Sequence, residues 1–227
     1  MPRETLTKEQ VLRAAVEVLD AEGVAGLNVR RLGAQLGVAS TAMYYYVKSK
    51  DELVTLAADL VWHEIELPDP ATSDWRSAAA VLAREVHEMI GRHFWLLAAM
   101  STHVIYGPGK ARFDECGLAV FEGAGFDGRD ADHAAATLLM YVIGAAQGSA
   151  AEQAWEARLR RGGGEPGVRQ PGVLAYATEA AAQFPRLRAR LNAPTPVETL
   201  PGSTGFEFGL RTVLDGLQAR LATTQEK

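Results

Sequence analysis

The stretch NVRRLGAQLGVASTAMYYYVKSK, residues 28–50, decides the fold of the amino-terminal part of the chain. Asn28 is a favourable N-cap for a short helix over 29–36, and Gly37 supplies the positive φ angle that a sharp turn requires. A second short helix is expected over 40–46. Apolar side chains would pack these two helices against each other: Leu32, Leu36, Val38 and Met43. The pattern predicts a helix-turn-helix motif.

Helical patterns continue on both sides of this motif. Thr7 and Gln10 match a capping box, and the apolar residues that follow share one face of a helix that would end at Gly23. Ser49 is the expected N-cap of a longer helix, KDELVTLAADLVWHEIEL, over 50–67. The first 67 residues therefore predict four helices.

Alternating β patterns are scarce in the rest of the chain, and helical patterns dominate it. Asp74 can cap the first of the remaining helices, which are expected over 75–93, 94–105, 110–125, 130–161, 173–183 and 206–221. Two segments rich in glycine or proline, 162–172 and 192–205, are expected to be loops. The sequence thus predicts an all-α protein of nine or ten helices, with a small amino-terminal unit and a larger helical body.

The composition is that of a globular protein, with 48% hydrophobic and 22% charged residues. The longest apolar stretch, 134–146, is shorter than the roughly 20 residues of a membrane span. The amino terminus has no apolar segment typical of a secretory signal, and the single cysteine, Cys116, allows no intrachain disulfide. We therefore expect a cytoplasmic protein without a membrane partner.

The balance of charge changes sign along the chain. Residues 1–50 carry seven basic and five acidic side chains, whereas residues 51–227 carry sixteen and twenty-three, and the whole chain has a net charge of −5. A positive amino-terminal unit beside a negative body is expected if only the former contacts a polyanion.

The segment GVAGLNVRRLGAQLGVASTAMYYYVKSKDELV, 23–54, resembles the DNA-binding domain of the TetR family, especially its tetracycline-repressor branch. Glycine, tyrosine and lysine all fall in register with the turn of that branch. The segment FEFGLRTVLDGLQARL, 206–221, resembles its last dimerisation helix. The resemblance implies an all-α fold, with a three-helix helix-turn-helix DNA-binding domain over 1–51. A helical ligand-binding and dimerisation domain would follow over 52–227.

The resemblance also implies roles for individual residues of the motif. Arg30 matches a position that can reach a guanine edge, because a guanidinium presents the two donors that guanine O6 and N7 accept. Three residues of the second helix match positions that face the bases: Ser40, Thr41 and Tyr45. Five further side chains are expected at the DNA backbone: Asn28, Tyr44, Tyr46, Lys48 and Lys50.

Six of these residues have an alternative role that the sequence leaves open. The three tyrosines could pack on the fourth helix, and this alternative is strongest for Tyr46. Lys48 and Lys50 could be solvated charges, and Arg30 could be an ordinary surface arginine.

The resemblance places a small-molecule cavity in the helical body. The tetracycline repressor holds its drug as a magnesium chelate through a histidine, but here Met100 stands about where that histidine is expected. Leu82 and Val86 take the places of the asparagine and phenylalanine that grip the drug. We therefore expect no metal or cofactor and an apolar or aromatic ligand. The candidate lining residues, each of which could also be ordinary core, are Trp62, His63, Leu82, Val86, Met100, His103, Phe113, Tyr141 and Trp155.

No catalytic constellation accompanies these features. The segment GPGK, 107–110, lacks the spacing of a phosphate-binding loop, and neither His-Glu pair has the second histidine of a zinc-protease helix. The leading hypothesis is a ligand-responsive transcriptional repressor, a homodimer on a pseudo-palindromic double-stranded DNA operator that a small-molecule inducer releases. The alternatives are an activator built from the same parts and a helical protein that sequesters small molecules without reading an operator.

Overall fold

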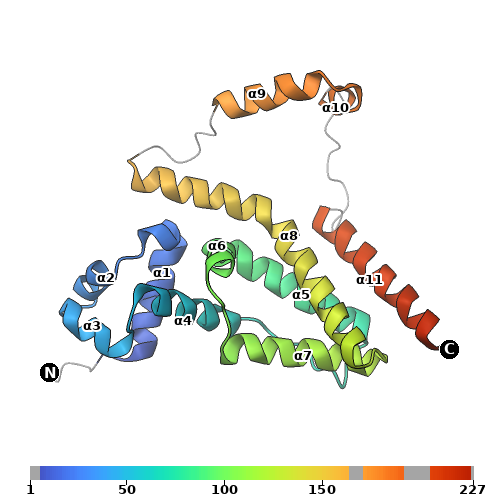
Figure 1. Ribbon diagram of the computed structural model, residues 1–227, viewed down its shortest axis with the longest axis horizontal. Helices are drawn as coiled ribbons and strands as arrows, with labels where there is room; N and C mark the ends of the chain where they lie inside the picture. The colour runs from blue at the N-terminus through green and yellow to red at the C-terminus, as the bar shows by residue number, and fades with distance from the viewer. Residues whose placement is uncertain (1–5, 164–170, 192–204, 226–227) are drawn as a thin grey trace.

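The computed structural model describes residues 6–163, 171–191 and 205–225, and every regular element in these ranges is an α-helix (Figure 1). The eleven helices of these ranges are α1 (Lys8–Gly26), α2 (Val29–Gln35), α3 (Ser40–Tyr46), α4 (Lys50–Trp62), α5 (Trp75–Arg92), α6 (Trp95–Thr102), α7 (Pro108–Ala124), α8 (Gly128–Arg161), α9 (Pro171–Ala182), α10 (Pro185–Leu191) and α11 (Gly205–Gln225). The predicted all-α class is confirmed, and α10 is a helix that the sequence analysis did not predict.

The helices α1, α2 and α3 form the head of the molecule, and their predicted caps are present. Thr7 and Gln10 form a reciprocal capping box at the start of α1. The side-chain oxygen of Asn28 accepts hydrogen bonds from the backbone N–H groups of Arg30 and Arg31, in the first turn of α2, at 2.9 and 3.2 Å. Gly23 has a φ angle of 69° and interrupts α1, but it does not end the helix as predicted, because one further helical turn follows it, up to Gly26.

The turn between α2 and α3 has the predicted geometry. Gly37 has a φ angle of 70°, a left-handed conformation that favours glycine. Leu32 and Met43 are buried between the two helices. A Cβ atom on Gly33 would lie only 2.9 Å from Cγ of Met43, so the helices cross too closely for a larger residue there. Residues 28–46 therefore form a tightly packed helix-turn-helix.

The fourth helix, α4, ends earlier than the sequence predicts, at Trp62 rather than at residue 67. Arg112 of α7 donates from Nη2 to the carbonyl oxygens of Trp62 (3.5 Å), His63 (3.3 Å) and Ile65 (2.7 Å). These acceptors are satisfied by a side chain from another element, so the chain can leave the helix without leaving them unpaired.

The long helix α8 runs through the centre of the body (Figure 1), where it packs against α1, α5, α7 and α11. Its buried residues recur at helical spacing and are mostly small: Ala131, Ala134, Leu138, Val142, Ala146 and Ala150. The helix α4 packs on both α1 and α7 and so connects the head to the body. By length and composition alone α8 could span a membrane, but it packs against five helices, the four above and α6, and is the central helix of the body.

The helices α9 and α10 stand apart from the other helices and pack on each other (Figure 1). They leave large apolar side chains exposed, namely Tyr176, Phe184, Leu187 and Leu191. Of the two predicted loops, most of 162–172 and nearly all of 192–205 lie outside the described residues. Pro171 and Gly172 belong to α9 rather than to the first of these loops.

Candidate functional site

One face of α3 is directed to solvent and the other into the head. Thr41 is exposed, Tyr44 is 53% exposed and Tyr45 is 88% exposed, whereas Met43 and Val47 are buried. Aromatic side chains usually stabilise a protein by being buried, and a tyrosine whose ring is mostly exposed contributes little in this way. The exposed face of α3 is therefore suited to contact a partner. The side chain of Ser40 lies outside what the structure describes.

Tyr46 differs from its two neighbours because it is partly buried. Its hydroxyl donates a hydrogen bond to the backbone oxygen of Leu6 at 2.8 Å, and its ring meets that of Tyr45 edge-on at 5.5 Å between centroids. This arrangement favours the packing alternative for Tyr46 over the expected contact with a phosphate, because the hydroxyl is engaged within the head. The partner of the hydroxyl lies in the segment before α1.

Basic side chains with no acidic partner border the exposed face of α3. Arg30 on α2, Lys48 after α3 and Lys50 at the start of α4 pair with no carboxylate in the part of the chain that the structure describes. The hydroxyl of Ser49 accepts a hydrogen bond from the backbone N–H of Glu52 at 3.0 Å and so caps α4 at the predicted position.

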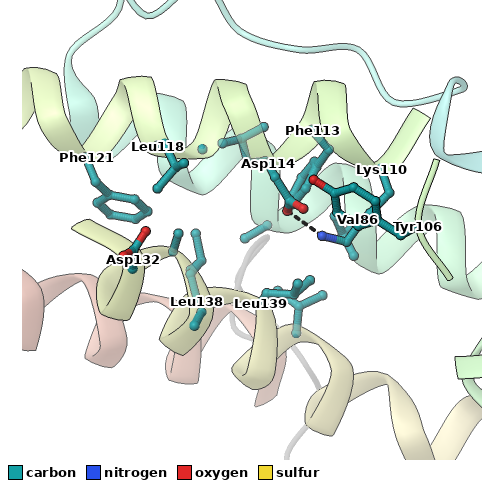
Figure 2. A pocket seen from close by; sticks show the side chains of 16 residues that line it. Val86, Tyr106, Lys110, Phe113, Asp114, Leu118, Phe121, Asp132, Leu138 and Leu139 are labelled. Atoms are coloured by element: carbon teal, nitrogen blue, oxygen red, sulfur yellow. Dashed lines mark hydrogen bonds and ion pairs between the residues drawn. The ribbon is translucent and has the colours of Figure 1, made fainter. Parts of the chain in front are cut away.

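A second candidate site is a cavity of about 420 Å³ between α5, α7 and α8 (Figure 2). Its walls are largely apolar, and they include Leu82, Val86, Phe113, Leu118, Phe121, Leu138, Leu139 and Val142. The volume falls within the roughly 300–1,000 Å³ of small-molecule sites. Three of the predicted lining residues, Leu82, Val86 and Phe113, take part in it.

The polar groups of this cavity were not among the predicted residues. Lys110 and Asp114 form an ion pair in its wall, and Tyr106 lies beside them (Figure 2). The Lys110 side chain is only 12% exposed, and its Nζ lies 5.1 Å from the centroid of the Trp62 ring. Asp132 also lines the cavity and has no basic partner within the described ranges. The spacing of Lys110 and Asp114, four residues apart on a helix, was a signal that could have identified them.

The other six predicted lining residues do not line this cavity: Trp62, His63, Met100, His103, Tyr141 and Trp155. Trp62 is buried behind Phe113, with the ring centroids 5.0 Å apart. Tyr141 stacks on Phe206 of α11 and donates its hydroxyl to the backbone oxygen of that residue. These two aromatic side chains fill contacts between helices, and packing of this kind is not visible in a helical pattern.

The cavity adjoins a joint between α7 and α4. The buried carboxylate of Asp59, on α4, accepts hydrogen bonds from the backbone N–H groups of Gly109 (3.2 Å) and Lys110 (3.0 Å) in the first turn of α7. A carboxylate at a helix N-terminus is stabilised by the free N–H groups and by the helix dipole. Asp59 on α4 and Arg112 on α7, which binds carbonyl groups at the end of α4, together attach the wall of the cavity to the helix that leads into the head.

A buried histidine forms a second connection between head and body. His93, after α5, is 5% exposed and lies 2.7 Å from Asp20 of α1 through Nδ1 and 3.0 Å from Glu64 through Nε2. The indole N–H of Trp95 also donates to Asp20, at 2.6 Å. Burial alone would lower the pKa of His93, but its hydrogen bonds to the two carboxylates, and their charges, outweigh burial and raise it.

Comparisons with known proteins agree with this architecture. Residues 11–57 match the family model "Bacterial regulatory proteins, tetR family", and residues 67–221 match "Tetracyclin repressor-like, C-terminal domain". The HTH-type transcriptional repressor DrrR1 of Streptomyces coeruleorubidus is 34% identical, over 97% of this chain and 80% of its own length. The class A tetracycline repressor protein from transposon 1721 of Escherichia coli is 29% identical, over 95% of this chain and 92% of its own length.

Solved structures give the same result. The Streptomyces coelicolor TetR family protein ActR in complex with actinorhodin has a TM-score of 0.71 and 26% identity, over 96% of this chain and 97% of its own. Its complex with (S)-DNPA has a TM-score of 0.70 and 26% identity, over 96% of this chain and 100% of its own. These relatives and both family models describe transcriptional regulators rather than enzymes. The chain therefore belongs to the TetR family of ligand-responsive, DNA-binding transcriptional repressors.

Proposed function

We propose that the protein is a cytoplasmic homodimer that holds a pseudo-palindromic operator with its two heads and releases it when a small molecule enters the cavity. The observation that carries this proposal is the joint between α7 and α4. The first turn of α7 contributes Lys110 to the cavity and, through its backbone, holds Asp59 of α4. A ligand that displaces this turn would move α4. Because α4 begins four residues after α3, the reading helix that would enter the DNA groove, α3 would move with it.

The head would bind the major groove through α3. We assign Arg30, Ser40, Thr41 and Tyr45 to base edges, and Asn28, Tyr44, Lys48 and Lys50 to the DNA backbone. The exposure of Tyr44 and Tyr45 and the unpaired charges of Arg30, Lys48 and Lys50 support these roles. We assign Tyr46 to the packing of the head, because its hydroxyl already has a partner.

The inducer would be a largely apolar or aromatic molecule that fits between α5, α7 and α8. The walls support this class, because Phe113, Phe121 and several aliphatic side chains surround the cavity. The Lys110–Asp114 pair and Asp132 would orient its polar groups. The complexes of ActR with actinorhodin and (S)-DNPA support a small-molecule ligand for this chain.

The dimer would form by pairing of α8 and α11 with the same helices of a second copy. Met140 on α8 is 71% exposed and Phe208 on α11 is 70% exposed. Only 28% of the most apolar window of α8 is buried within its own chain, which leaves a large apolar surface for a partner. A four-helix bundle of this kind would set the two reading helices about 34 Å apart, one turn of the DNA duplex.

The test is a fluorescence-anisotropy titration of the promoter region beside the protein's own gene, with and without candidate inducers. Lys50→Ala should weaken binding to every duplex and lower the salt slope by about 0.9 per protomer, because one phosphate contact is lost. Arg30→Ala should instead relax the choice of sequence. Arg129→Ala, an exposed arginine at the far end of α8, is the matched control and should bind as the wild type does.

If both head variants bind like the wild type, the assignment of the head is wrong. If the wild-type protein binds ligands but no duplex, it is a sequestering protein and not an operator-binding one. Because the two sites are thermodynamically coupled, operator DNA must weaken inducer binding by the same factor by which the inducer weakens DNA binding.

A further inference from the structure

A hollow on the surface of the head reaches beyond the helix-turn-helix to the end of α8. Its polar lining comprises Glu22, Asn28, Arg30, Arg31, Tyr44, Lys50 and Arg161. The first six belong to the head and the start of α4, whereas Arg161 is the last residue of α8. We call this feature the junction hollow. It brings a side chain of the ligand-binding body next to residues assigned to the DNA backbone.

The junction hollow is strongly positive. It contains four basic side chains and a single carboxylate, that of Glu22. Arg31 uses that carboxylate in an ion pair, and the charges of Arg31 and Arg161 both lower the pKa of Glu22, after the larger effect of its hydrogen bond from Arg31. Arg30 and Lys50 have no acidic partner in the described ranges. Three positive charges therefore remain without full compensation around one concave surface.

Arg161 differs from the two other arginines at the end of α8. Arg158 lies over the ring of Trp155, with Cζ 5.9 Å from the ring centroid, and Arg160 forms an ion pair with Glu156 at 3.8 Å. Both interactions stay within α8. Arg161 instead crosses to the head, where Nη1 donates a hydrogen bond to the backbone oxygen of Glu22 at 2.8 Å. That acceptor is neutral, so the guanidinium charge is not balanced by this contact.

We propose that Arg161 binds a phosphate of the DNA backbone, in the junction hollow, as a contact that comes from the body rather than from the helix-turn-helix. The proposal rests on the proposed function, in which Asn28, Tyr44 and Lys50 lie along the same backbone. A guanidinium can hold a carbonyl with one N–H group and two phosphate oxygens with the others. The contact at Glu22 keeps the Arg161 side chain extended across the junction, so little conformational entropy is lost when the phosphate binds.

Through this contact the operator DNA would bind the ligand-binding body directly. The same helix that ends in Arg161 lines the inducer cavity with Asp132, Leu138 and Val142 near its other end. Arg161 reaches the phosphate only while the end of α8 stays against α1. A change in the angle between head and body therefore removes one phosphate contact per protomer, in addition to any change in the spacing of the reading helices.

The experiment measures how DNA affinity depends on salt for the full-length wild type, Arg161→Gln, Arg161→Lys and Arg160→Gln, each with the promoter duplex and an unrelated duplex. Arg161→Gln should lower the salt slope by about 0.9 per protomer, or about 1.8 for a dimer, with both duplexes. Its affinity deficit should therefore shrink about 12-fold between 50 and 200 mM salt. Arg161→Lys should keep most of the slope because it keeps the charge, and Arg160→Gln, the matched control, should keep all of it.

The outcomes separate this inference from the proposed function. If the wild type binds neither duplex, the proposed function fails. If it binds and Arg161→Gln has the wild-type slope, the inference is wrong, and a loss of affinity with an unchanged slope would assign Arg161 to holding α1 against α8. In a titration with inorganic phosphate at constant ionic strength, any loss of DNA binding should be larger for the wild type than for Arg161→Gln, because free phosphate and a DNA phosphate would compete for the same guanidinium. A larger loss for Arg161→Gln would contradict the inference.

Discussion

The three adjacent tyrosines of α3 have different environments because successive residues of a helix point about 100° apart. Tyr44 and Tyr45 are directed to solvent, and Tyr46 is directed towards the segment before α1. The run of tyrosines therefore has two purposes. Two rings form the surface that we assign to DNA, and the third attaches the start of the chain to the head.

Replacing Tyr46 by phenylalanine separates these two purposes. The change removes the hydrogen bond to the backbone oxygen of Leu6 and leaves that oxygen unpaired, so stability should fall by about 0.5–1.5 kcal/mol. DNA affinity and its salt slope should stay the same, as thermal unfolding and anisotropy titrations would measure. Tyr45→Phe is the control and should leave the stability unchanged. A lower salt slope for Tyr46→Phe would instead place its hydroxyl on a phosphate.

The protonation of His93 should make the joint between head and body depend on pH. The imidazole faces Asp20 and Glu64, and Arg92 pairs with Glu64 at 3.3 Å. The pKa of His93 is raised above its ordinary 6.5, so its contribution to stability is complete below about 6.5 and is lost as the pH rises through the raised pKa. The imidazolium, not the neutral ring, is the form that binds both carboxylates.

The measurement for His93 is the difference in melting temperature between the wild type and His93→Asn across the pH range. The difference should be larger near pH 6 than near pH 8.5, by about 2–4 °C for each kcal/mol of pH-dependent stability. Working with the difference removes the opposite effect of His87, whose pKa burial lowers. His133→Asn, an exposed histidine of α8, should show no such trend. A pH-independent difference would mean that His93 acts only through packing.

At the scale of elements, two sets of hydrogen bonds connect α4 to α7. Asp59 binds the start of α7, and Arg112 of α7 binds the carbonyl groups at the end of α4. The backbone approaches closely here, since a Cβ atom on Gly107 would lie 2.5 Å from the Asp59 carboxylate. Two helices held at two points move as one unit, and a signal from the cavity to the head depends on this.

Asp59→Asn should weaken the hydrogen bonds between α4 and α7 without removing all of them. An amide keeps one acceptor oxygen but turns an NH2 group towards the N–H donors of α7, so stability should fall by about 1–3 kcal/mol. Inducer binding should persist, while the coupling factor between inducer and DNA should decrease. Calorimetric titration of the inducer with and without operator measures that factor. Asp127→Asn, an exposed aspartate before α8 whose side chain makes no cap hydrogen bond, is the control, and equal coupling in both variants would refute the joint as the route.

At the scale of the whole molecule, the described surface has apolar groups that one chain does not cover. Met140 and Phe208 are more than two-thirds exposed on adjacent helices, α8 and α11. A separate set of exposed apolar residues lies on α9 and α10, among them Tyr176 and Leu187. An operator with two half-sites requires two heads at a set spacing, and pairing of the two bodies is the arrangement that would supply it.

Met140→Glu combined with Phe208→Glu should therefore produce monomers. Two carboxylates in an apolar interface cannot be buried without a large desolvation cost, so the dimer should dissociate at micromolar concentration. Sedimentation velocity measures the oligomeric state, and operator affinity should fall with it. Val104→Glu, an equally exposed apolar residue before α7, is the control. A wild-type protein that sediments as a monomer would refute the bundle itself.

The sequence by itself determined the features that depend on neighbouring residues. The all-α class, the helix-turn-helix and the caps at Thr7, Asn28 and Ser49 follow from signals that lie within four residues of the groups they affect. The positive φ angle of Gly37 follows in the same way, because only glycine adopts it without a steric penalty.

The tertiary structure alone decided the features that join residues far apart in the chain. Arg112 donates a hydrogen bond to the last carbonyl group of α4, which lies 50 residues away in the sequence. The hydroxyl of Tyr46 donates to a backbone oxygen 40 residues away. The cavity likewise needs three helices side by side before Lys110 and Asp132 can share it. Helical periodicity indicates which residues lie on one face of a helix, but the neighbour that covers this face depends on how the whole chain packs.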